Sequence, residues 1–135
     1  MLAMPFSIDQ ALGVFPQALQ LEAQRAQLLA SNIANADTPG YKARDIDFKA
    51  ALAAQGGQGG ALPLMRTNPE HMEPSAAGGP APVLYQVPLQ PSLDGNTVNL
   101  QYNQAAFGEN ALRYQATLTI LSGRLSGLSK AIMGT

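Results

Sequence analysis

A chain of 135 residues with a net charge of −1 and 13% charged residues is one domain's worth of sequence, and it lacks the basic surface that a nucleic-acid partner requires. It has no cysteine, which excludes disulfides and thiolate metal sites, and its single histidine makes a catalytic triad hard to assemble. The 46% apolar fraction includes 22 alanines and no tryptophan, so the chain has little bulk for a self-sufficient core. We therefore expect either a weakly stable monomer or apolar surface that neighbouring chains complete, and no enzyme activity.

The first expected element is a helix over residues 8–35. Ser7 can cap its start. Pro16 leaves two outcomes open, namely one long helix kinked at Pro16 or a firm helix that begins there. The apolar spacing is maintained across Pro16 and favours the kinked long helix. Apolar residues at alternating spacings of four and three, with Glu22 as the exception, mark its packing face: Ile8, Leu12, Phe15, Leu19, Ala26, Leu29 and Ile33.

Residues 36–97 form the expected turn-rich middle, with eight of the ten prolines and eight of the thirteen glycines. Pro39 ends the first helix, and Gly40 is expected to adopt a positive φ. The further expectations are a short strand or irregular arm at 41–48, one or two helical turns at 48–54, a flexible joint at 56–60, an edge strand at 83–90 and a tight turn at Asp94-Gly95.

The histidine, His71, lies in this middle between Glu70 and Glu73. A cluster of one histidine and two carboxylates is far more often a solvated loop than a metal site. We expect no metal and no cofactor.

The last expected element is a helix over residues 98–132, capped by Thr97 or Asn99. One stripe of eight residues follows the alternating spacing of four and three throughout: Phe107, Ala111, Tyr114, Leu118, Leu121, Leu125, Leu128 and Ile132. The sequence thus predicts a single, mainly α domain over 1–135. Its two long terminal helices pair as an antiparallel, coiled-coil-like hairpin around a Pro/Gly-rich middle that is partly extended or disordered. The residues predicted to pack between helices or subunits are this stripe with Leu12, Leu19, Ala26, Leu29 and Ile33.

The string SNIANADTPGYK at residues 31–42 resembles the N-terminal signature of the bacterial flagellar axial proteins, which comprise rod, hook and hook-associated subunits. The short chain, KARDIDF after the signature, PSLDGNTVNL at 91–100 and the segment 109–132 are similar to the short proximal rod subunits of that family. The resemblance covers both ends of the chain and little of residues 49–88. Its signature turn comprises Asn32, Asn35, Asp37, Thr38, Pro39, Gly40 and Tyr41.

The resemblance implies a structural component of the flagellar basal body that supports motility. Such subunits polymerise with other rod proteins into the periplasmic rod, which links the MS ring and export gate to the distal rod. The implied partners are other copies, other rod proteins, the adaptor FliE, the MS ring and the export gate. Export by the flagellar type III apparatus without a cleaved signal is also implied, and the N-terminal segment MLAMPFSIDQALG lacks the features of a signal peptide. We expect no direct membrane insertion, because no apolar run reaches about 20 residues, and no small-molecule substrate or nucleic acid.

Two other functions stay open. The chain could instead be another short rod protein, of the FlgC type, but the string SLDGNTV and the absence of an inserted domain argue against this. A non-flagellar helical-hairpin adaptor that closes into a dimer would reach a fixed size with rising concentration, whereas a rod subunit would stay monomeric or grow without limit.

Overall fold

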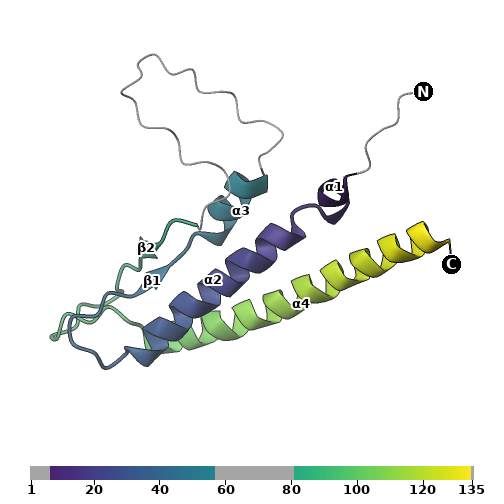
Figure 1. Cartoon of the computed structure of the whole chain (residues 1–135). Coiled ribbons are helices and arrows are strands. Elements are labelled where there is room, and N and C mark those ends of the chain that lie inside the picture. The colour runs from purple at the N-terminus through teal and green to yellow at the C-terminus, as the bar shows by residue number, and fades with distance from the viewer. Residues whose placement is uncertain (1–6, 57–80, 135) are drawn as a thin grey trace, which may run out of the picture.

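The fold is a pair of antiparallel helices with a short arm that leaves one end of the pair and runs back beside the first of them (Figure 1). The computed structural model describes residues 7–56 and 81–134. Helix α2 (Phe15–Ala34) lies along the N-terminal part of α4 (Leu100–Met133). The direction follows from two contacts, because Asn32 near the end of α2 meets Asn103 near the start of α4, and Glu22 meets Thr117. The predicted mainly α helical hairpin is confirmed.

The first helix is broken, so the single helix expected over 8–35 is wrong. A short α1 (Ile8–Leu12) ends at Gly13, whose φ of 64° lies in the left-handed region that glycine tolerates. Helix α2 then begins at Phe15 with Pro16 in its first turn, where the missing amide proton of proline costs nothing. Pro16 therefore starts a helix instead of kinking one. Ser7 precedes α1, but its side chain makes no capping hydrogen bond.

Helix α4 begins two residues later and ends one residue later than predicted. Asn99 caps it, since its side-chain oxygen accepts a hydrogen bond from the Tyr102 amide at 3.0 Å. The other candidate cap, Thr97, instead accepts the amide of Ala43 at 2.8 Å and so binds the arm. The helix ends where Gly134 takes a φ of 70°.

The arm is a minimal antiparallel ribbon with one helix on it. Strand β1 (Arg44–Asp45) pairs with β2 (Leu84–Tyr85), with Arg44 opposite Tyr85 and Asp45 opposite Leu84. Helix α3 (Phe48–Gly56) confirms the expected helical turns. A small core joins the arm to α2, and its members are Leu21, Ile46, Ala51 and Ala81, flanked by Leu28, Phe48 and Leu52. The His71 cluster and most of the joint at 56–60 fall outside the described residues.

Two glycine turns lie against each other at the end of the helix pair. Gly40 has the predicted positive φ, 72°, and Gly95 has a φ of 76°. The Gly40 amide donates to the Asp94 carbonyl at 2.8 Å, and a Cβ on Gly95 would lie 3.6 Å from the Gly40 Cα. The signature turn and the Asp94-Gly95 turn therefore form one unit that links α2, the arm and α4.

Candidate functional site

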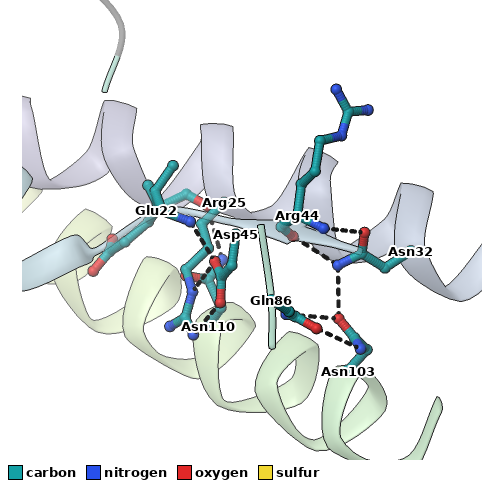
Figure 2. Close-up of polar contacts among 9 residues, drawn as sticks. Glu22, Arg25, Asn32, Arg44, Asp45, Gln86, Asn103 and Asn110 are labelled. Atoms are coloured by element: carbon teal, nitrogen blue, oxygen red, sulfur yellow. Dashed lines mark hydrogen bonds and ion pairs between the residues drawn. The ribbon is translucent and has the colours of Figure 1, made fainter. Parts of the chain in front are cut away.

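The signature asparagine Asn32 holds the arm to the helix pair (Figure 2). Its side chain is fully buried. The amide nitrogen donates to the Arg44 carbonyl at 2.7 Å, and the amide oxygen accepts from the Arg44 N–H at 3.0 Å. The side chain thus pairs with both backbone groups of one strand residue, as a neighbouring strand would. Asn32 is therefore a structural bridge between α2 and β1.

The same amide extends the bridge to α4. Asn32 also donates to the Asn103 side-chain oxygen at 2.8 Å, and Asn103 exchanges two longer hydrogen bonds of 3.3 Å with Gln86 beyond β2. Figure 2 shows these side chains converging between α2, the arm and α4. A buried asparagine pair of this kind fixes the register of two helices, because a shifted register would leave both amides unpaired.

A second asparagine closes the C-terminal end of α2. The Asn96 side-chain nitrogen donates to the carbonyls of Asn35, Ala36 and Thr38 at 2.8–3.0 Å. These carbonyls lie at and beyond the last turn of α2, where no further helical N–H is available. Residue 96 belongs to the PSLDGNTVNL string, which therefore supplies the cap for the signature turn.

A partly buried ion pair adds a third connection between α2 and the arm. Arg25 donates to both carboxylate oxygens of Asp45, at 2.9 and 3.1 Å. The hydrogen bond to Asp45 raises the pKa of Arg25, so this guanidinium is charged at every physiological pH. This bidentate geometry orients β1 relative to α2.

Polar groups also occupy the middle of the seam between α2 and α4. Glu22 is 3% exposed, and one of its carboxylate oxygens accepts from the Thr117 hydroxyl at 3.1 Å. Its backbone carbonyl accepts from the Asn110 side chain at 2.8 Å. Burial raises the pKa of Glu22, and this outweighs the Thr117 hydrogen bond and the charge of Arg113, which lower it. Glu22, which breaks the predicted apolar face, is thus a central member of the seam.

A raised pKa has a defined effect on stability. The protonated Glu22 carboxyl stabilises the fold fully below the ordinary glutamate pKa of about 4.3, and this contribution is lost as pH rises through the higher folded-state pKa. We expect Glu22→Gln to be more stable than wild type at pH 7, with a difference that shrinks toward pH 4. Urea denaturation of both proteins at the two pH values measures it. A difference that is the same at both values contradicts the assignment.

The predicted N-terminal face lies partly in the seam. Leu29 is fully buried, whereas Leu12, Leu19, Ala26 and Ile33 are half-buried. Besides Leu29, the buried α2 positions are Ala18, Leu21, Glu22 and Asn32, none of which the predicted packing residues included.

The predicted C-terminal stripe is not the buried face of α4. Tyr114, Leu121 and Leu128 are half-buried, and Ala111 is exposed. Phe107 and Leu118 are each 38% exposed, Leu125 is 47% exposed and Ile132 is 76% exposed. The face that meets α2 carries Asn103, Ala106, Asn110 and Thr117. The five exposed members lie about 100° around the helix from the buried ones and outside the seam of the hairpin, so for them only the predicted packing between subunits still applies.

The remaining signature residues shape the turn. The Asn35 side chain donates to the Ser31 carbonyl at 2.8 Å and accepts from the Thr38 hydroxyl at 3.1 Å. The Tyr41 hydroxyl lies 2.9 Å from the Ser31 hydroxyl. Asp37 and Pro39 are exposed to solvent at the end of the helix pair.

Sequence reasoning missed the polar face of α4, although a signal for it exists. Asn103, Asn110, Thr117 and Arg124 recur every seven residues, which is the spacing of one helix face. Arg124 continues the face beyond the seam, because its guanidinium lies 4.6 Å from the centre of the Phe15 ring and donates to the Ala11 carbonyl at 3.1 Å. Arg124 thus attaches α1 and the start of α2 to α4.

Within residues 7–56 and 81–134, no group of three acidic, histidine or cysteine side chains is close enough to hold a metal ion. Among the helices of these same segments, none is both long and apolar enough to cross a membrane.

Comparison with known proteins identifies the family. Residues 17–42, which comprise most of α2 and the signature turn, match the model of the flagella basal body rod protein family. The chain is 54% identical over 126 residues to the flagellar basal body rod protein FlgB of Cereibacter sphaeroides, covering 91% of this chain and 94% of that protein. It is 46% identical over 132 residues to FlgB of Salmonella typhimurium, covering 94% and 96%. It is 43% identical over 130 residues to FlgB of Escherichia coli, covering 93% and 94%.

All three relatives are named flagellar basal body rod proteins, and all three carry the name FlgB, which favours this assignment over the FlgC type. The matched regions cover nearly the whole of each chain. The resemblance noted in the signature is thereby confirmed. This chain belongs to the FlgB family of flagellar basal body rod proteins.

Proposed function

We propose that this chain is a structural subunit of the proximal rod, and that it polymerises through the outward stripe of α4. We define the outward stripe as Phe107, Ala111, Leu118, Leu125 and Ile132. The observation that carries the proposal is that these residues stay exposed although α4 is already paired with α2. The relatives are named as rod proteins, which supports the rod as the structure that the subunits form.

The geometry of the stripe suits a subunit contact. Its members lie within a narrow arc of about 60° on the helix surface, so one neighbouring helix can cover them all. Burial of the part of each large apolar side chain that is still exposed contributes a fraction of the roughly 1.5–3 kcal/mol of complete burial. A surface that meets a different surface on the next copy propagates as a filament and does not close into a dimer.

The proposal includes the neighbours and the route that the signature implies. The neighbours are other copies, other rod proteins, the adaptor FliE, the MS ring and the export gate. The route is export through the type III apparatus without a cleaved signal, and the location is the periplasmic rod. The role is structural, so it involves no catalysis, cofactor, small-molecule substrate, nucleic acid or membrane insertion.

The arm is a second candidate contact, and Gly40 sets its direction. A valine at a φ of 72° is strained by about 1–2 kcal/mol, although a Cβ there meets no atom within 4 Å. We expect Gly40→Val to keep most of its helix content by circular dichroism and to yield far fewer rods from cells that make only the variant. Gly108→Ala, at a helical position with equally open space, is the control and should assemble normally. Wild-type recovery of rods with Gly40→Val rejects a directing role for this turn.

Deletion and complementation test the function itself. We expect cells that lack this chain to be non-motile and to contain MS rings without rods, and a plasmid copy to restore both. Swimming in soft agar and electron microscopy of isolated basal bodies provide the two measurements. Motile cells with intact rods in the deletion strain would contradict the proposal.

A further inference from the structure

The helix pair buries the more polar of two available faces of α4. Asn110 and Thr117 are buried against α2, whereas the next residue along the helix in each case, Ala111 or Leu118, is exposed. A turn of α4 by about 100° about its axis would exchange the two faces. Apolar burial alone favours the exchanged arrangement, because it removes leucine and phenylalanine side chains from water. Polar groups on α2 must therefore select the polar face, and they are Asn32, which binds Asn103 at the start of α4, and Glu22, which meets its middle.

Glu22 is placed to make that selection. Its carboxylate accepts from Thr117, and its backbone carbonyl accepts from Asn110. In the exchanged arrangement Ala111 and Leu118 would occupy these places, and neither has a side-chain hydrogen-bond donor. The carboxylate would then be buried without a partner, which is far more costly than its present state.

The present seam is itself imperfect. One Glu22 carboxylate oxygen and the Asn110 side-chain oxygen are buried without a hydrogen-bond partner among the residues that the structure describes. A seam selected only for stability would not keep such groups, since an apolar side chain of similar volume would be as stable or more so. Polar groups that lower stability while excluding an alternative pairing are a known source of helix-pair specificity.

We infer that Glu22 is a specificity-determining residue, which keeps the polar face of α4 on α2 and leaves the outward stripe free for a second chain. The selection within one chain follows from the seam alone. The use of the free stripe by a second chain rests on the proposed function.

A single introduced thiol reports which face of α4 is outward. The chain has no cysteine, so Leu118→Cys gives one reactive position. In the wild-type background we expect rapid reaction with a maleimide in the isolated monomer, since Leu118 is 38% exposed. With Glu22→Leu the exchanged arrangement becomes available, and we expect labelling to slow by about tenfold or more while thermal stability is unchanged or higher. Glu22→Ala, which introduces no bulk, should slow labelling in the same direction.

Glu22→Gln is the matched control, because its amide oxygen still accepts from Thr117 and its labelling should stay fast. Unchanged labelling in both Glu22→Leu and Glu22→Ala overturns the inference, whether or not rods form. Slowed labelling supports it, and rod assembly by the same variants then separates it from the proposed function. Slowed labelling with normal rods means that Glu22 selects the face but that the outward stripe is not the rod contact.

Discussion

Replacing Leu118 and Leu125 together with aspartate is expected to leave the monomer folded and to abolish rod assembly. Neither side chain belongs to the buried face of α4, and their exposed fractions are 38% and 47%, so the monomer loses only part of a side chain's apolar burial at each position. The lower helix propensity of aspartate destabilises the monomer by about 0.5 kcal/mol per substitution. In a subunit contact, by contrast, each change removes the burial of the part still exposed in the monomer, about 1 kcal/mol, and places an unpaired carboxylate against apolar surface, which costs more. The same loss recurs at every contact along the rod.

Circular dichroism of the purified variant and recovery of rods from cells that make only this variant measure the two effects. Ala105→Asp with Ala116→Asp is the matched control, because it adds the same charge at exposed positions about 140–160° around α4 from Leu118. Cells that make this control variant are expected to swim. Normal rods with the leucine variant would show that the outward stripe is not a subunit contact.

The second large effect is expected for Asn32→Ala, which should lower the free energy of unfolding by about 2–4 kcal/mol. The substitution removes hydrogen bonds to both backbone groups of Arg44 and to the Asn103 side chain. It leaves these groups buried or partly buried without their partner. Three segments lose one common attachment, so the arm and the start of α4 should loosen together.

Urea denaturation followed by circular dichroism measures this change. Gln27→Ala is the control, because Gln27 is an exposed amide side chain on the same helix and its loss should change stability by less than about 0.5 kcal/mol. A similarly small change for Asn32→Ala would show that the buried network does not hold the arm.

The elements that local signals specify were predicted well. The helix end at the signature turn, the positive φ of Gly40 and the Asn99 cap each depend on a few neighbouring residues. The break at Gly13 was missed because the apolar spacing continues across it, and spacing does not report a backbone angle. Pro16 at the start of α2 was one of the two outcomes that the sequence left open.

The face on which α4 pairs was not predictable from the apolar pattern. An apolar stripe predicts that some partner covers it, but not whether that partner is in the same chain. The choice of the α4 face depends on Glu22, which lies 95 residues from Thr117 in sequence. In the sequence Glu22 only interrupts the apolar pattern, and its role follows from its hydrogen bond to Thr117. Likewise, Asn96 lies 60 residues from the carbonyl of Ala36 that it caps. Contacts between residues this far apart in sequence can be recognised only in the folded structure.

The central claim is that α4 uses two faces, the polar one within the chain and the outward stripe between chains. A cryo-EM map of basal bodies from cells that make this chain tests it most directly. We expect Asn103, Asn110 and Thr117 against α2 of the same chain, and Phe107, Leu118 and Leu125 buried against an adjacent subunit. A map in which these three apolar side chains face the lumen or solvent, or pack on α2 of their own chain, would contradict the claim.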